Sequence, residues 1–139
     1  MNPSMRLFRR IAIASSGLTF GTIGALALFL PVAVARAYGL TLDGVNGLDE
    51  FRAVYTGFWF SLAVAMITAA RRDDNPLLGD ICGVMLLFQA LGRLASFGLD
   101  GRPGWPFVAA FIAELAGALT ILAPRVLGAR AAALPAGAR

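Results

Sequence analysis

The chain has 139 residues, of which 58% are hydrophobic, and its mean hydropathy is +0.75. Its 12 basic residues, all arginine, outnumber its 8 acidic residues and give a formal net charge of +4. This composition is too apolar for a soluble domain and predicts a single integral membrane domain. The arginines gather at the ends of apolar segments instead of forming one continuous basic face, which argues against nucleic-acid binding.

The chain has no histidine, and its single cysteine, Cys82, lies within an apolar run. A histidine-based catalytic triad, a Cys/His zinc site and an intramolecular disulfide are therefore excluded. We expect no metal and no cofactor, and we interpret Cys82 as a small core residue.

The first predicted spanning helix covers residues 11–35 and follows a short basic N-terminus at residues 1–10. Its 25 uncharged residues are enough to cross a bilayer with some tilt, and Pro31 should kink or end the helix near its far side. A cleavable signal peptide is the alternative, because Ala35-Arg36-Ala37 imitates a cleavage site after the apolar run. The run is longer than that of a usual signal peptide, which favours a retained span.

Three more apolar segments are predicted to span the membrane, at residues 49–70, 77–99 and 105–124. Asp49 should cap the first of these helices, and Asp80 reads as a first-turn acid at the membrane interface. The tail at residues 125–139 is rich in Ala and Arg and should be loose or lie at the surface. The predicted fold is an all-α, antiparallel four-helix bundle within residues 11–124.

Two pairs of glycines have the small-xxx-small spacing that lets another helix backbone approach closely. Gly17 and Gly21 form one pair in the first segment, and Gly79 and Gly83 form the other in the third segment. Glycine is frequent in spanning helices in any case, so the spacing has either a packing role or no specific role.

The arginines also predict an orientation. Of those in the termini and connections, two, Arg36 and Arg102, fall on one side of the four-span topology. The other side has eight, namely Arg6, Arg9, Arg10, Arg71, Arg72, Arg125, Arg130 and Arg139. The side with more arginine is the cytoplasmic side, so both termini are predicted to be cytoplasmic.

Two ionisable residues lie well inside apolar segments, Arg93 in the third and Glu114 in the fourth. Glu114 lies nine residues into its helix, about 14 Å along the axis, at a depth similar to that of Gln89 on the antiparallel neighbour. Gln89 and Arg93 are four residues apart and share one helix face. An unpaired ion at mid-membrane costs at least ~2.5–3.5 kcal/mol, so Arg93 and Glu114 should pair with each other or face a water-filled cavity.

Further polar residues are predicted near this pair, in the outer half of the membrane. The second helix contributes its outer end, and the turn between the third and fourth helices borders the cluster. The complete predicted cluster is Glu50, Arg52, Tyr55, Gln89, Arg93, Asp100, Arg102 and Glu114. It is either a ligand or proton site that opens outward or a structural bridge that fixes helix packing.

An ordered set of residues resembles a family of small bacterial four-span membrane proteins classed only as a domain of unknown function. The set is Glu50-Phe51-Arg52-Ala53-x-Tyr55-x-Gly57, then Gly92-Arg93, then Asp100-Gly101-x-Pro103, then Glu114. The resemblance covers about residues 20–123. It implies four spans and shared positions at Glu50, Arg52, Tyr55, Gly57, Arg93, Asp100, Gly101 and Glu114, but it implies no activity. We expect the protein in a bacterial cytoplasmic (inner) membrane.

A second resemblance concerns the stretch from Asn46-Gly47-Leu48 to Gly57-Phe58-Trp59, which is similar to four-span scaffold proteins of sterol synthesis. That similarity implies a noncatalytic partner of membrane enzymes, by analogy only. Thr56 stands where the first family often has a second glycine, which puts close packing of the second helix at that point in doubt.

We therefore expect a noncatalytic inner-membrane accessory or scaffold subunit, whose partners are membrane lipids and either another membrane protein or a second copy. The alternative is a binding or transport module for a small amphiphile such as a quinone, sterol or lipid, which would use the Arg/Glu cluster. An enzyme is disfavoured, because Glu114 could serve as a general base but no nucleophile or metal set accompanies it.

Overall fold

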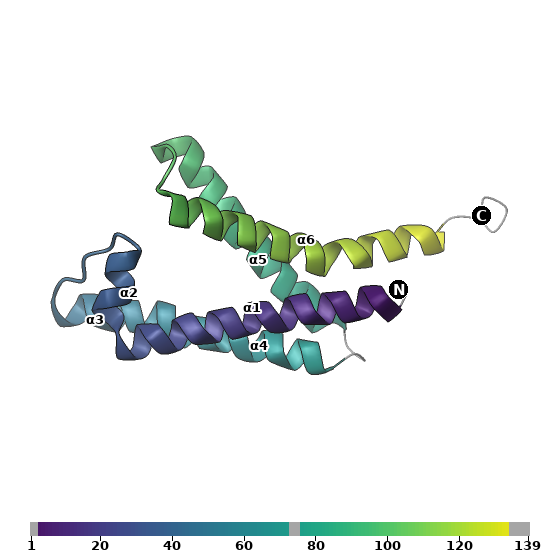
Figure 1. Cartoon of the computed structure of the whole chain (residues 1–139), viewed down its shortest axis with the longest axis horizontal. Helices are drawn as coiled ribbons and strands as arrows, with labels where there is room; N and C mark the ends of the chain where they lie inside the picture. Colours follow the sequence, from purple (N-terminus) through teal and green to yellow (C-terminus); the bar gives the residue numbers. More distant parts are fainter. Residues whose placement is uncertain (1–2, 73–75, 134–139) are drawn as a thin grey trace. The chain divides into compact units, whose positions relative to one another are not determined.

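The structure is a computed structural model that describes residues 3–72 and 76–133, with side chains up to residue 127. All regular secondary structure in this described part is helical (Figure 1). The elements are α1 (Pro3–Phe29), α2 (Pro31–Ala37), α3 (Gly44–Arg52), a π-helix η1 (Ala53–Phe58), α4 (Trp59–Arg71), α5 (Pro76–Asp100) and α6 (Trp105–Ala133).

Four helical stretches are long and apolar enough to cross a membrane: Pro3–Phe29, Gly44–Arg71, Pro76–Asp100 and Trp105–Leu127. The all-α prediction with four spanning helices is therefore confirmed. The predicted Asp73-Asp74-Asn75 break between the second and third helices lies outside the described residues, as do residues 134–139 of the predicted tail.

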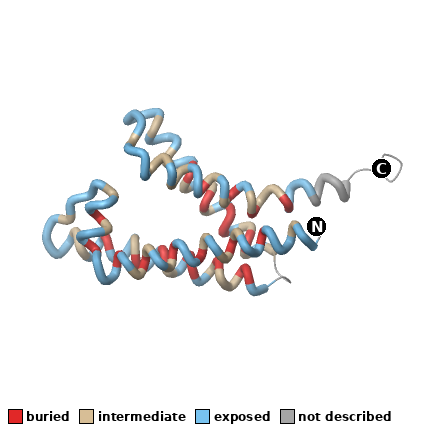
Figure 2. The backbone as a smooth tube through the Cα atoms, viewed as in Figure 1, coloured by how far each residue is buried: buried red, intermediate tan, exposed pale blue. Residues whose placement is uncertain are grey.

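The chain forms two compact units. The central unit is Ala14–Thr68, and the terminal unit combines Met1–Ile13 with Ala69–Arg139. Within each unit, the buried positions follow the helix sides that pack on a neighbouring helix, and the other sides are exposed (Figure 2). Each unit is described by itself below.

In the central unit, the second half of α1 packs against α4 through glycines. A Cβ added to Gly17 would lie 3.0 Å from the Cβ of Met66, and one added to Gly21 would lie 3.6 Å from the Cβ of Ala63. Helix α1 ends at Phe29, because Pro31 disfavours the helical conformation at the residue before it. Pro31 then occupies the first turn of α2, where its missing N–H has no helical acceptor.

Aromatic rings fill the other end of the central unit. Tyr55 stacks on Phe51 with ring centroids 4.3 Å apart, and Trp59 lies 4.8 Å from Tyr55. Phe20 of α1 meets Trp59 edge to face at 5.5 Å. These rings attach α3, η1 and α4 to α1 at Phe20, because aromatic pairs of this geometry add about 0.5–1.5 kcal/mol each to their burial.

The second span differs from the prediction at its start and in its interior. It begins at Gly44 and not near Asp49, because Gly44 adopts a φ of +57° that turns the chain into the helix directly after Asp43. Its π-helical segment widens the backbone at Ala53–Phe58 and buries Thr56, whose Oγ1 has no hydrogen-bond partner among the described residues. The sequence contains no signal for this π-helix.

In the terminal unit, α5 and α6 form an antiparallel hairpin. The connection turns at Gly101, whose φ of +92° suits glycine, and Phe97 meets Phe111 edge to face near this turn. Further along the hairpin, a Cβ added to Gly83 would lie 2.9 Å from the side chains of Ile121 and Leu122. The helices approach closely at Gly83 because it has no side chain.

Both ends of the chain are more helical than predicted. Residues 3–10 belong to α1, and Arg9 is buried with 7% of its surface exposed. Helix α6 does not end at Pro124 but continues to Ala133. Pro124 removes one helical hydrogen bond and crowds the carbonyl four residues earlier, but the alanine-rich sequence that follows has high helix propensity and continues the helix.

Candidate functional site

The two ionisable residues predicted to pair inside the membrane, Arg93 and Glu114, form a bidentate ion pair between α5 and α6. Arg93 Nε donates to Glu114 Oε2 at 2.8 Å, and Arg93 Nη2 donates to Glu114 Oε1 at 2.9 Å. The Arg93 side chain is 21% exposed and the Glu114 side chain 10%. Since one guanidinium engages both carboxylate oxygens in a planar fork, the geometry is that of a strong, charge-assisted contact.

The other predicted residues of the terminal unit do not join this pair. Gln89 is half-buried one turn before Arg93 and makes no hydrogen bond to the pair in the described structure. Asp100 accepts a hydrogen bond from Ser96 at the exposed end of α5, and Arg102 is exposed in the connection.

The remaining three predicted residues belong to the central unit. Glu50 and Arg52 are exposed on α3. Tyr55 is half-buried, and its ring stacks among aromatic neighbours. The predicted eight-residue cluster is thus divided between two units, and the ion pair found within it joins Arg93 to Glu114.

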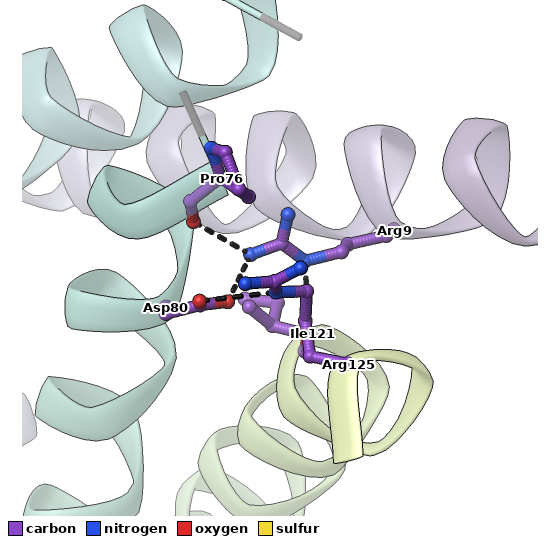
Figure 3. Close-up of polar contacts among 5 residues, drawn as sticks. All are labelled: Arg9, Pro76, Asp80, Ile121 and Arg125. Atoms are coloured by element: carbon purple, nitrogen blue, oxygen red, sulfur yellow. Dashed lines mark hydrogen bonds and ion pairs between the residues drawn. The ribbon is translucent and has the colours of Figure 1, made fainter. Parts of the chain in front are cut away.

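A second polar site was not predicted from the sequence. Arg9 of α1, Asp80 of α5 and Arg125 of α6 meet within the terminal unit (Figure 3). Arg9 Nη2 donates to Asp80 Oδ1 at 2.6 Å, and Arg125 Nε donates to Asp80 Oδ2 at 3.1 Å. Asp80 is therefore the carboxylate that joins three helices, and not the interfacial first-turn acid predicted from its position in the sequence.

Arg9 also binds two backbone carbonyls. Its Nε donates to the Ile121 carbonyl at 2.9 Å and its Nη2 to the Pro76 carbonyl at 3.2 Å (Figure 3). Pro124 has no N–H for the Thr120 carbonyl four residues earlier, so the helical hydrogen-bond ladder of α6 is interrupted next to Ile121. A buried guanidinium with several donors suits a helix region of this kind.

Gly79 makes room for this arrangement. A Cβ at position 79 would lie 2.7 Å from Arg9 Nη2 and 3.0 Å from Ile13 Cδ1. The Arg9 guanidinium therefore lies directly on the backbone of α5, and a larger residue would displace it from Asp80. The sequence carried partial signals of this site, namely Gly79 beside an acid and Pro124 beside an arginine, but nothing that linked them to Arg9.

The described residues contain no group of three or more Cys, Asp or Glu side chains placed to hold a metal ion. Their polar side chains instead connect helices: Arg93 to Glu114 across the α5–α6 hairpin, and Asp80 to the arginines of α1 and α6.

Four helices of spanning length, with ion pairs buried between them, are the features of a multi-pass helical membrane protein. The chain belongs to the family described as Domain of unknown function (DUF4345), which matches residues 8–123. That match includes Arg9, Asp80, Arg93 and Glu114 and ends before Arg125. No curated protein and no solved structure matches the chain.

Proposed function

We propose that this protein is a noncatalytic accessory or scaffold subunit of a larger membrane complex. The observation that supports this function best is the use of both Glu114 oxygens by the Arg93 guanidinium. A carboxylate that acts as a base or binds a ligand needs an oxygen directed at the reacting group. Here both oxygens bind the neighbouring helix, which fits a role in fixing helix packing.

The proposal includes a place in the cell. The excess of arginine in the termini and in the connection between α4 and α5 supports cytoplasmic termini in a bacterial cytoplasmic membrane. Arg9 and Ile13 are buried in the terminal unit, which supports a first helix that stays in the mature protein. The partner is another membrane protein or a second copy of this chain.

The test is mass spectrometry of the tagged protein purified gently from its native membrane, with proteins and lipids both identified. A stoichiometric protein partner is the expected result. A protein that is always monomeric and brings no partner from the native membrane contradicts the proposal.

A variant separates structure from chemistry at the ion pair. In the double variant Arg93→Met with Glu114→Leu, the two helices keep an apolar contact but lose both charges. If the pair is structural, this protein folds and retains the partner, because apolar replacement of a buried ion pair is often neutral. A folded double variant that loses its partner or its cellular effect assigns a functional role to the two charges.

A second candidate function, the binding of a small amphiphile, is favoured by an apolar recess in the terminal unit. The recess holds about 360 Å³ and lies between the start of α1 and α6. Its lining consists of Ser4, Met5, Phe8, Leu119, Thr120, Ala123, Pro124 and Leu127. This volume falls within the range of small-molecule sites, about 300–1,000 Å³.

The amphiphile candidate has its own test in the same purification. A retained quinone, sterol or lipid without a protein partner favours it, and Ala123→Phe should then displace that molecule by filling the recess. Ala109→Phe, at an exposed position on the same helix, is the matched control. Equal retention in both variants counts against the recess as the binding place.

A further inference from the structure

A basic recess of about 200 Å³ lies in the terminal unit beside the Arg9–Asp80 ion pair. Five arginines line it, three from α1, one that follows α4 and one from α6: Arg6, Arg9, Arg10, Arg72 and Arg125. Pro76, the first residue of α5, also lines it, so the positive end of that helix dipole lies at the recess.

The recess has an excess of positive charge. The described carboxylate next to it is Asp80, whose two oxygens already bind Arg9 and Arg125. Asp73 and Asp74 lie outside the described residues. Even if both of these acids were adjacent, five arginines against three carboxylates would leave two positive charges. Guanidinium groups that line one recess repel one another, and an anion bound among them offsets this repulsion.

The arginines are partly held in position. Arg9 is buried and fixed by its bonds to Asp80, Pro76 and Ile121, and Arg10 donates from Nε to the Ala70 carbonyl at 2.9 Å. Holding side chains in place before a ligand arrives lowers the entropy cost of binding. Guanidinium groups match phosphate oxygens in a planar, bidentate geometry, which makes arginine the residue best suited to that anion.

The size of the recess limits the ligand. About 200 Å³ is below the range of sites that enclose a whole drug-sized molecule, but it suits a single phosphate group whose remainder lies outside. The recess also lies where α1 and α5 begin and α4 ends, which is the end of the helices that the arginine distribution assigns to the cytoplasmic leaflet. Basic pockets between helices on that side bind anionic head groups.

We propose that this recess, formed by Arg6, Arg10, Arg72 and the Arg9–Asp80–Arg125 cluster, binds the phosphate group of an anion, supplied by an anionic phospholipid or by free phosphate. This site is separate from the Arg93–Glu114 pair. Phosphate binding there does not require that the protein act as a scaffold subunit. The exposed arginines Arg6, Arg10 and Arg72 contact the phosphate, while Arg9 and Arg125 with Asp80 hold the helices that carry them.

The test uses the full chain in phosphatidylcholine nanodiscs with and without cardiolipin. The bound lipid is counted by native mass spectrometry. The triple variant Arg6→Gln, Arg10→Gln, Arg72→Gln removes three of the arginines and leaves Arg9, Asp80 and Arg125 unchanged. Each arginine near anionic lipid contributes about fivefold to binding, so we expect a loss of roughly a hundredfold. The matched control is Arg36→Gln with Arg52→Gln, which removes exposed arginines of the central unit and should change binding less than about twofold.

A second arm separates the two sources of phosphate. Inorganic phosphate is added to the detergent-purified protein in increasing amounts, and the Tm of thermal unfolding is measured at each concentration. The reference is a chloride buffer without sulfate at the same ionic strength. Cardiolipin binding without a phosphate-induced rise in Tm assigns the recess to a lipid head group. A rise that disappears in the triple variant assigns it to free phosphate.

Two outcomes overturn the proposal. One is an equal loss of cardiolipin from the control and the triple variant, which would reflect net charge alone. The other is the absence of both cardiolipin retention and a phosphate-induced rise in Tm in the wild-type protein. If the triple variant does not fold, the single variant Arg6→Gln takes its place, because Arg6 is exposed; it should weaken binding about fivefold.

Discussion

The bidentate contact between Arg93 and Glu114 predicts non-additive stability changes. Glu114→Leu removes the carboxylate that neutralises the Arg93 guanidinium, and Arg93→Met removes the cation that neutralises the Glu114 carboxylate, each inside a spanning helix. A charge that is not neutralised there costs about 2.5–3.5 kcal/mol. The loss of stability for Glu114→Leu should be about 2.5 kcal/mol, because the Arg93 side chain is 21% exposed and its long stem lets the charge reach the interface.

The loss of stability for Arg93→Met should be about 3.5 kcal/mol, because the Glu114 side chain is shorter and only 10% exposed. The double variant should lie within about 1 kcal/mol of the wild type, since an apolar pair replaces the ion pair at little cost. The two single losses together amount to about 6 kcal/mol, so the predicted departure from additivity is large.

The free energy of unfolding is measured by reversible titration with SDS in mixed micelles, with helix content followed by circular dichroism. Asp100→Asn, which alters an exposed hydrogen bond to Ser96, is the control and should change stability by less than about 0.5 kcal/mol. A double variant whose loss equals the sum of the single losses would refute the reasoning, as would two single variants of wild-type stability.

Three other predictions follow from the packing and the topology. Gly79→Ala should lower the free energy of unfolding by about 1–3 kcal/mol in the same titration, because the new Cβ meets the fixed Arg9 guanidinium. Gly92→Ala is the control and should be neutral or stabilising, because a Cβ there has no atom within 4 Å. Equal effects of the two variants would contradict the close packing at Gly79. Trp59→Ala should lower the free energy of unfolding by about 3–5 kcal/mol, because Trp59 is 8% exposed. Trp105→Ala should lower it by less than about 1 kcal/mol, because Trp105 is 66% exposed. Comparable losses would show that the aromatic cluster does not stabilise the fold. Arg102→Cys should react with a membrane-impermeant maleimide in intact cells, because the connection after α5 is predicted to lie outside. The native Cys82 is buried and should not react. Labelling only after permeabilisation would show that the orientation is the opposite of the predicted one.

The spanning helices could be predicted from sequence because hydropathy and length are local properties. An apolar run of about 20 residues between charged or glycine-containing connections has few alternatives in a bilayer. The break at Pro31 was equally local, since proline restricts the residue before it in any context. Helix ends were less predictable, as the starts at Pro3 and Gly44 show. At a helix end, the free energies of capping and of helix propensity differ between neighbouring residues by only about one kcal/mol.

The Arg93–Glu114 contact could also be anticipated, because the two ions lie within about one helical turn of each other in depth on adjacent antiparallel helices, and opposite charges inside a membrane attract strongly. The absence of Gln89 from this contact could not be predicted, because the depth of a residue along the helix axis does not determine the direction of its side chain. The π-helix at Ala53–Phe58 and the buried Thr56 had no sequence signal, because an inserted residue in a helix depends on packing around it.

The sequence by itself determined that this protein is helical, that it has four spans, and that Arg93 and Glu114 needed partners. Only the tertiary structure decided that Arg9 and Asp80, 71 residues apart, are partners and that Arg125 shares the same carboxylate. The physical reason is that an arginine at a helix end can extend into water, so its sequence position does not reveal burial. Its burial follows from the meeting of α1, α5 and α6 around Asp80, and those contacts exist only once the chain has folded.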